Sequence, residues 1–433
     1  MIRNRPIYTG KPFFAFILIL ISASSLLLYL SLTTHGKFVS EDTNIVVENC
    51  LIKEWKHFSK IFTQDYFAIS GEVGYRPIVT ISYFIDYAVW HLNPFGFHLT
   101  NVIAHTINTV LFYLFLRTVI RSSTIILLST FFFVTHPILV ETVKAIAYRG
   151  YLLSATFLLV SLIYFVKSDT LLYKETNQKK RVRLYYFISL AAYFCALFSK
   201  EIAITLPILL MLLAMFPDKT KGHEPPPKFD NGHGKEKSPG QKIWPAMIKR
   251  LKGIYIGYFI ISAFYLLIWF AVFSNHTSTA VHQPACFWLN TLTMIKVLAS
   301  YIKLSFFPFN FNVNYAVPPV KSPLEISFIL SAVLLLSILT IFIFLCRWRN
   351  IIAYWIAWFF IVLLPAANIF PAGNIMSHFY IPVMGFCVIK GILIYRITDI
   401  TLSARALPLR RVVQMVLIIL TIGGSGFSII WRN

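Results

Sequence analysis

Two adjacent carboxylates, Glu41 and Asp42, follow the first long apolar run of the chain, in the stretch GKFVSEDTNIVVENC. A carboxylate that removes a proton from a hydroxyl group turns that group into a nucleophile, and a positioned base of this kind contributes about 10²–10⁴-fold to a rate. Adjacent side chains point in different directions on a helix or strand, so we expect one acid to act as the base and the other to bind the acceptor, a cation or the backbone. The competing interpretation is a helix cap, in which Ser40 or Thr43 supplies the hydroxyl and the acids favour the helix dipole.

Several basic residues are candidates to bind a phosphate group. Lys296 and Lys303 are two helical turns apart in an otherwise apolar segment, so both ammonium groups lie on one face of a predicted helix at the level of the lipid headgroups. Snorkelling without a ligand is the alternative for this pair. Arg149, in the stretch THPILVETVKAIAYRG, can bind a phosphate bidentately or form an ion pair with Glu141. Lys200, in the stretch SKEIAITLP, is a further candidate.

Histidine and amide side chains form a second group of candidates. The stretch FHLTNVIAH places His98, Asn101 and His105 three and four residues apart, and therefore on one helix face. Two histidines seven residues apart with no carboxylate nearby give a weak metal signal, so we assign no metal ligand and favour hydrogen bonds between helices. The other residues expected to line the same outer pocket are Arg76, Asp86, His136, Glu141 and Glu201.

The composition is that of an integral membrane protein. The 433 residues are 57% hydrophobic and 13% charged, with a mean hydropathy of +0.70, which lies outside the range of soluble globular domains. The net charge of +22 gathers in short connectors between apolar runs, whereas nucleic-acid binding needs basic residues interleaved with aromatic ones on a solvated face. We therefore predict an all-α polytopic membrane protein whose partners include membrane lipid and exclude nucleic acid.

About eleven apolar segments are long enough to cross the hydrocarbon core as helices, which takes about 20 residues each. They are residues 12–34, 96–118, 122–140, 150–166, 184–199, 202–216, 253–273, 324–346, 351–367, 379–396 and 412–430. Two further segments, 76–92 and 286–307, are ambiguous. If neither crosses, most of the 39 Lys and Arg residues lie in inner connectors, as the positive-inside rule requires. We therefore predict that both segments are helices on the outer surface.

This topology gives a single transmembrane domain, residues 1–433, with long connectors on both sides. Residues 35–95 and 274–323 form outer loops, the first of which carries the acidic pair, and residues 217–252 form a basic cytoplasmic loop against anionic lipid. The N-terminus is predicted to be cytoplasmic and the C-terminus extracytoplasmic. Most acidic residues fall on the outer side, several of them within or at the ends of apolar spans, where a carboxylate costs about 2–3 kcal/mol unless it faces a cavity or a partner. Function is therefore expected at the outer face.

Six stretches of this chain resemble, in the same order, the membrane region of the transmembrane and tetratricopeptide-repeat O-mannosyltransferases and their prokaryotic relatives. They are FVSEDTNIVVEN, YRPIVTISYFIDYAVWHLNPFGFHLTNVIAH, HPILVETV, FSKEIAITLP, LLPAANIFP and FYIPVMGFCVI. The resemblance runs from about residue 12 to 430, and RPxxxxSxxxDYxxWxLNPFGFHLTN is its most specific part.

The resemblance implies a GT-C glycosyltransferase. Such an enzyme transfers a sugar from a polyprenyl phosphate, typically mannose from dolichyl phosphate, to a protein hydroxyl on the lumenal or extracytoplasmic side. In that family an acidic pair in the first outer loop is the catalytic motif, and Glu41 and Asp42 match it. We favour Asp42 as the base that activates a Ser, Thr or sugar hydroxyl for inverting attack, while the leaving lipid phosphate is held by the cations named above. A divalent cation is neither required nor excluded by these residues.

Two features depart from the family pattern. Where relatives commonly have Glu-Arg before the aromatic residue of FYIPVMGFCVI, this chain has Ser377 and His378, so His378 becomes a candidate for binding the donor phosphate. The helical repeats of the family would follow the last span, and this sequence ends at Asn433. Three alternatives follow for the recognition of a protein acceptor: the repeat module is missing from this chain, it is supplied by a separate repeat-containing subunit, or it is not needed.

Alternative functions stay open at the level of sequence. The same donor could serve a glycan or glycolipid acceptor. A transporter or lipid flippase would also have many spans, but it should place ionisable residues near the middle of broken helices, and here they cluster at the outer ends of spans. A non-catalytic assembly subunit is the third alternative, if the acidic pair is only a cap. The host membrane is either the bacterial inner membrane or the endoplasmic reticulum.

Overall fold

The computed structural model describes residues 11–34, 36–38, 41–63, 74–173, 178–216, 254–273, 287–306, 317–348, 350–366 and 378–401. Within these residues the chain is helical and contains no strand, which confirms the predicted all-α class. The helices are α1 (Lys11–Tyr29), α2 (Ser31–Thr34), η1 (Thr43–Val47), η2 (Leu51–Lys53), η3 (Trp55–Phe62), α4 (Pro77–Trp90), α5 (Pro94–Val119), α6 (Ser123–Val134), α7 (Leu139–Lys144), η4 (Ile146–Tyr148), α8 (Arg149–Tyr173), α9 (Lys179–Leu197), η5 (Glu201–Thr205), α10 (Leu206–Met215), α12 (Ile256–Phe273), α13 (Phe287–Phe306), α14 (Ile326–Arg347), α15 (Ile351–Leu363), η8 (Leu364–Ala366) and α16 (Pro382–Thr401).

The long apolar helices make this an integral membrane protein. Four helices in the described part of the chain are long and apolar enough to cross a membrane, namely Pro12–Tyr29, Pro94–Val119, Ile146–Leu172 and Ile326–Arg347. Shorter apolar helices accompany them at Ser123–Val134, Glu201–Met215, Ile256–Val272 and Ile351–Leu363. The count of about eleven crossings stays a prediction. Its last span, 412–430, and the basic loop 217–252 lie outside the described residues.

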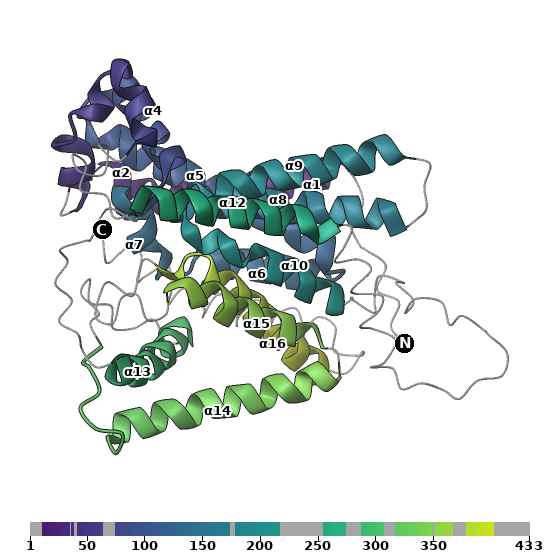
Figure 1. Ribbon diagram of the computed structural model, residues 1–433. Coiled ribbons are helices and arrows are strands. Elements are labelled where there is room, and N and C mark those ends of the chain that lie inside the picture. The colour runs from purple at the N-terminus through teal and green to yellow at the C-terminus, as the bar shows by residue number, and fades with distance from the viewer. Residues whose placement is uncertain are drawn as a thin grey trace.

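The bundle carries its short helices at one end. In Figure 1, α8, α9 and α12 run side by side across the molecule, while α4 and the short purple helices that follow the acidic pair stand beyond one end of them. The connection between α7 and α8 lies at that same end. The irregular segments that carry most of the candidate site residues therefore gather at one end of the bundle.

Both segments predicted as surface helices are helical, as α4 and α13. A tight turn joins α4 to α5: Asn93 Oδ1 accepts the Phe95 N–H at 3.1 Å and Pro94 occupies the first helical position, an arrangement typical of helix starts. The Trp90 ring lies over Gly96 in this turn, so that a Cβ at Gly96 would stand 2.0 Å from the ring. This close packing explains why the sequence has glycine at that position.

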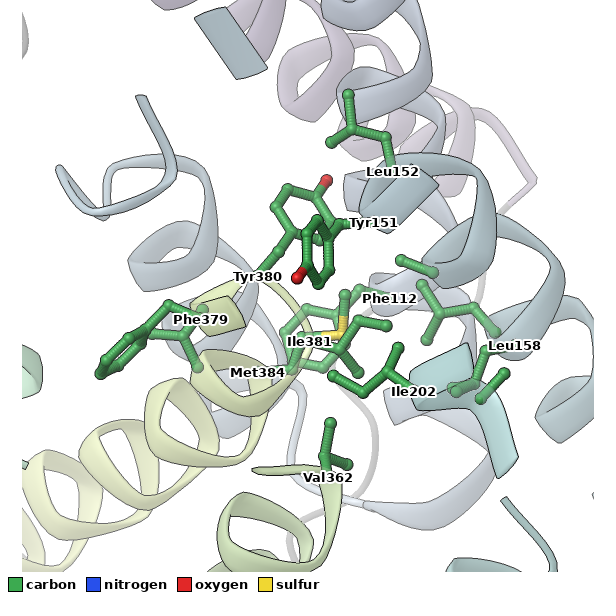
Figure 2. Close-up of a cluster of buried hydrophobic side chains, with 14 of the residues drawn as sticks. Phe112, Tyr151, Leu152, Leu158, Ile202, Val362, Phe379, Tyr380, Ile381 and Met384 are labelled. Carbon is green, nitrogen blue, oxygen red and sulfur yellow. The ribbon is translucent and has the colours of Figure 1, made fainter. Parts of the chain in front are cut away.

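The hydrophobic core lies where α5, α8, η5, α15 and the start of α16 converge (Figure 2). The side chains drawn there are almost completely buried, and they include Phe112, Tyr151, Leu152, Leu158, Ile202, Val362, Phe379, Tyr380, Ile381 and Met384. The first residues of α16 are thus fixed against α5 and α8. This packing also fixes the position of His378, directly before Phe379.

We expect the substitution Gly96→Ala to lower stability by about 1–3 kcal/mol, because the added methyl group must displace the Trp90 ring from a packed turn. Thermal unfolding of the purified protein in detergent would measure the loss as a lower Tm. Ile103→Ala, on the exposed side of α5, is the control and should leave the Tm close to that of the wild type. A Gly96→Ala protein with a wild-type Tm would contradict the packing argument.

Candidate active site

The two acids of the pair lie in different environments. Asp42 is 1% exposed, whereas Glu41 is exposed. Asp42 directly precedes the π-helical turn Thr43–Val47, but its side chain makes no capping hydrogen bond; its Oδ1 accepts the backbone N–H of Ala147 at 2.8 Å instead. The structure therefore gives Asp42 a tertiary contact where the cap interpretation expected a local one. Ala147 belongs to η4, between α7 and α8. We call residues 143–147, which run from the end of α7 into η4, the 143–147 turn.

Side chains of α4 and α5 hold the backbone of this turn. Asn101 Nδ2 donates to the carbonyl oxygens of Val143 and Ala145, both at 3.1 Å. Tyr83 Oη donates to the Ile146 carbonyl at 2.9 Å. The carbonyls of Ala145 and Ile146 also accept backbone N–H groups at η4, so the side-chain bonds add to the local helical bonds and fix the N–H to which Asp42 binds. Asp42 is thus positioned by residues from α4, α5 and the 143–147 turn.

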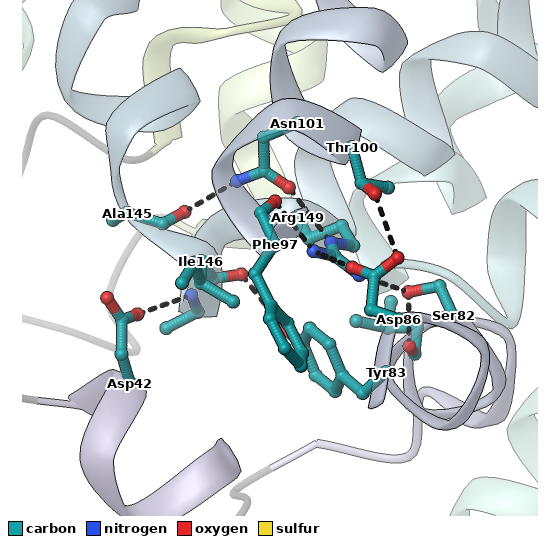
Figure 3. A network of polar contacts seen from close by, with 12 residues as sticks. Asp42, Ser82, Tyr83, Asp86, Phe97, Thr100, Asn101, Ala145, Ile146 and Arg149 are labelled. Carbon is teal, nitrogen blue, oxygen red and sulfur yellow. Dashed lines mark hydrogen bonds and ion pairs between the residues drawn. The ribbon is translucent and has the colours of Figure 1, made fainter. Parts of the chain in front are cut away.

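Arg149 forms the centre of this arrangement and is completely buried, with 0% of its side chain exposed. Its guanidinium contacts four oxygen atoms (Figure 3): Asn101 Oδ1 at 2.9 Å, Ser82 Oγ at 3.1 Å, the Phe97 carbonyl at 3.0 Å and Asp86 Oδ2 at 2.6 Å. Thr100 Oγ1 donates to the other oxygen of Asp86 at 2.8 Å. We call these six residues the Arg149 network, and every guanidinium nitrogen in it already has an acceptor.

This geometry bears on two predictions for Arg149. The ion pair that the structure forms is with Asp86 and not, as the competing prediction had it, with Glu141, which lies half-buried in α7. The guanidinium could bind a phosphate only by giving up one of these four contacts, one of which is to Asn101, the residue that holds the 143–147 turn. We therefore assign Arg149 and Asp86 to the support of the site and not to the phosphate.

A second group of ions lies close to the acidic pair. Arg76 binds Glu201 through two parallel hydrogen bonds, Nε to Oε2 at 3.2 Å and Nη2 to Oε1 at 2.9 Å. Lys200 Nζ lies 3.3 Å from Glu201 Oε1 and 4.5 Å from the centre of the Tyr151 ring. The negative charge of Glu41 also acts on the Lys200 ammonium. Arg76, Lys200, Glu201 and His378 form what we call the Lys200 cluster.

The charges of this cluster are shaped by burial and by one another. Burial, together with the positive charge of Arg76, lowers the pKa of Lys200 to about 8 against the opposing effect of Glu201. Burial would raise the pKa of Glu201, but Arg76 and Lys200 outweigh it and hold that pKa well below its ordinary value. At neutral pH the cluster therefore carries two cations and one anion. Unlike Arg149, Arg76 and Glu201 stay partly exposed, at 21% and 38%.

His378 contributes a neutral group to the cluster. Its Nδ1 lies 2.5 Å from the Tyr151 hydroxyl. Burial, with the positive charge of Lys200 added, lowers the pKa of His378 to about 3, so the ring is uncharged at physiological pH. It can offer a ligand a hydrogen bond but no charge. Ser377, beside it, lies outside the described residues.

The other predicted site residues have partners or positions of their own. Lys296 is 8% exposed and its ammonium binds Glu325 at 3.3 Å and the Pro318 carbonyl at 3.2 Å, whereas Lys303 is exposed near the end of α13. His98 is buried against Gly36, where a Cβ would stand 2.1 Å from the imidazole ring.

His136 lies two residues after the end of α6, and its Nε2 is 3.4 Å from the carbonyl oxygen of Ser305 in α13. Among the described residues no group of three or more His, Cys, Asp or Glu side chains could hold a metal ion. The roles of these residues stay predictions.

Comparison with known proteins finds similarity over part of the chain. No protein-family model matches the chain, and no solved structure gives a significant match. A protein O-mannosyl-transferase of Caenorhabditis elegans is 31% identical over 160 residues, which is 35% of this chain and 23% of the relative. The human protein O-mannosyl-transferase TMTC2 is 29% identical over 151 residues, 34% of this chain and 18% of the relative. This chain is related to the TMTC protein O-mannosyl-transferases.

The similarity to the TMTC proteins confirms the resemblance predicted from the six stretches. The mouse protein O-mannosyl-transferase TMTC1 extends it, with 26% identity over 230 residues, 51% of this chain and 24% of the relative. The matched region spans less than a quarter of the length of each of these TMTC relatives. The predicted extent, from about residue 12 to 430, is larger than any one of these matches covers.

Two contributors to the site were missed at the level of sequence. Tyr151 contacts both Lys200 and His378, yet a tyrosine in an apolar span gives no signal of such a role. The N–H of Ala147 has no signal at all, because the backbone is the same at every residue. Only the fold brings either group to the residues that the TMTC resemblance points to.

We expect Asp86→Asn to destabilise the protein by about 3–5 kcal/mol, because it leaves the buried Arg149 charge without its counterion. The matched control is Glu54→Gln, which removes the acid of the exposed Glu54–Lys56 pair and should have no measurable effect. Both variants are compared with the wild type by thermal unfolding in detergent. Equal Tm values for Asp86→Asn and Glu54→Gln would show that the buried pair does not support the fold.

Proposed function

We propose that this chain is a GT-C type inverting glycosyltransferase. It moves a sugar, mannose by analogy with the names of its relatives, from a polyprenyl-phosphate donor to a Ser or Thr hydroxyl of a protein. The observation that carries the proposal is a buried acid near a cation cluster: Asp42 is fixed on Ala147, and a Cβ at Gly150, three residues further on, would stand 3.5 Å from Lys200 Cδ. A base and a leaving-group site are the two parts that this transfer needs.

Asp42 is the base in this mechanism. Its carboxylate takes the proton of the acceptor hydroxyl as the hydroxyl oxygen attacks the anomeric carbon from the side opposite the phosphate. The new glycosidic bond forms, and the bond between the anomeric carbon and the phosphate oxygen breaks with its electron pair on the phosphate. The Ala147 N–H holds the carboxylate in one orientation.

Lys200 and Arg76 serve the leaving group. The polyprenyl phosphate gains negative charge as the bond to the sugar breaks, and cations held in a site of low dielectric stabilise that charge better than water does. Lys200 is 8% exposed and its cluster carries a net positive charge before the donor binds. His378 adds a neutral hydrogen-bonding group beside them, held by Tyr151.

The proposal also includes the side of the membrane on which the reaction occurs. The residues of the proposed site cluster where predicted outer loops meet, so the reaction would occur on the extracytoplasmic or lumenal side, with the N-terminus on the other side of the membrane. The donor would come from the bilayer and the protein acceptor from the aqueous side. A separate repeat-containing protein is the proposed partner for acceptor recognition.

We expect Asp42→Asn to lower kcat by about 10²–10⁴-fold with little change in the KM for the donor, because the amide cannot accept the proton. The assay follows radiolabelled mannose from dolichyl-phosphate mannose to extracytoplasmic or lumenal proteins, with purified enzyme in detergent. Glu48→Gln, an exposed acid outside the site, is the control and should keep wild-type activity. Wild-type kcat in Asp42→Asn would exclude Asp42 as the base, and absence of label transfer by the wild type would count against the proposed reaction.

The value of kcat/KM for the donor should also change with pH. Lys200 is protonated below its pKa of about 8 and neutral above it, so kcat/KM for the donor should fall about tenfold between pH 7 and pH 9, following the free enzyme. In Lys200→Arg the guanidinium stays charged over this range, and the alkaline fall should disappear. An unchanged alkaline limb in Lys200→Arg would show that another group causes it.

A further inference from the structure

Tyr265 lies on the face of α12 that packs against α9 and near the Lys200 cluster. Tyr258, Ser262 and Tyr265 are four and three residues apart, so they share this face. Two of the three are satisfied by α9: Tyr258 Oη lies 2.6 Å from Ser189 Oγ, and Ser262 Oγ lies 2.6 Å from Tyr193 Oη. The pattern of tyrosine and serine along α12 is therefore largely structural.

Tyr265 is the exception on this face. Its side chain is 2% exposed and its ring packs edge-on against Phe198 at 5.4 Å, yet its hydroxyl has no hydrogen-bond partner among the described residues. A buried hydroxyl without a partner costs free energy, and phenylalanine would fill the same space without that cost. The tyrosine therefore calls for an explanation other than packing.

The surroundings of this hydroxyl identify the kind of partner it lacks. Phe198, on which the Tyr265 ring packs, lies two residues before Lys200, and the ring of Tyr75, the neighbour of Arg76, packs on Phe198 at 5.8 Å. Tyr265 therefore lies at the edge of the Lys200 cluster. A ligand held there by Arg76 and Lys200 is an anion, and because each non-ester oxygen of a phosphate accepts more than one hydrogen bond, a phosphate can bind both cations and a further donor. A phenol O–H is a suitable donor to such an oxygen.

A lipid can reach this position from the bilayer. The other faces of α12 are exposed and apolar, with Phe264 at 48%, Leu267 at 69% and Phe270 at 60%. In Figure 1, α12 runs along the outside of the bundle beside α9. A polyprenyl chain lying along this surface could bring its phosphate to the middle of α12, where Tyr265 meets Phe198 just after the end of α9.

We propose that Tyr265 is a donor-binding residue whose hydroxyl donates a hydrogen bond to the phosphate of the polyprenyl-phosphate substrate. This inference rests on the proposed function and adds a residue from α12 to the phosphate site. It assigns to α12 a role that neither the acidic pair nor the Lys200 cluster indicates.

Binding of dolichyl phosphate, the product of the transfer, tests the proposal without requiring an acceptor. Tyr265→Phe should weaken binding about five- to tenfold, while the Tm without ligand stays the same or rises, because no hydrogen bond of the free protein is lost. Tyr193→Phe is the matched control from the same helix interface. It removes a hydroxyl that is bonded to Ser262, so it should lower the Tm and leave the affinity unchanged.

The same measurements show which idea fails. Wild-type affinity in Tyr265→Phe would overturn the role of Tyr265, and so would a lower Tm without ligand like that of Tyr193→Phe. Lys200→Met separates this result from a failure of the proposed function: if it weakens binding and Tyr265→Phe does not, only Tyr265 is misassigned. If neither variant weakens binding, the phosphate site itself is wrong. With inorganic phosphate as a second probe, a parallel loss in Tyr265→Phe assigns the contact to the phosphate oxygens, and a loss with the lipid alone makes it specific to the lipid-borne phosphate.

Discussion

The ion pair between Arg149 and Asp86 is the interaction on which the rest of the site depends. A charge with no exposed surface is tolerated only when a counterion and hydrogen bonds replace its hydration. Asp86 is the counterion, and Asn101, Ser82 and the Phe97 carbonyl supply the remaining contacts. Because these groups come from α4, α5 and the start of α8, none of the three elements can move independently without exposing a charge to an apolar environment. The connection before α8 is therefore held rigidly as well.

The position of Asp42 follows from this rigidity. Asn101 uses one end of its amide for Arg149 and the other for the backbone of the 143–147 turn, so a single side chain links the buried charge to the turn. The turn then presents the Ala147 N–H to Asp42. The base that we propose must meet a substrate hydroxyl within hydrogen-bonding distance, which requires a fixed position. Residues far from Asp42 in the sequence provide that position.

Much of this could be predicted from the sequence, and the limits have physical causes. Apolar run lengths indicated the long helices, and the residue types of Glu41, Asp42 and Lys200 indicated acid–base and phosphate chemistry. The residue types could not show which charged side chains form ion pairs with each other. Arg149 was a candidate for phosphate because a guanidinium suits it, but the same geometry suits Asp86 equally well. Likewise the seven-residue spacing of Lys296 and Lys303 placed them on one face without revealing that Glu325 meets the first of them.

The two ion groups of this end of the molecule differ in how far they are buried. The Arg149 guanidinium is completely buried and each of its nitrogens has an acceptor, whereas Arg76 and Glu201 keep 21% and 38% of their side chains exposed beside a lysine whose pKa burial has lowered to about 8. Buried charges with all their partners hold structure, because a ligand would have to break existing bonds. Partly exposed charges are stabilised further when an anion replaces the water around them. The charged-lipid binding that we propose would therefore use both kinds side by side, the first to fix the geometry and the second to bind the ligand.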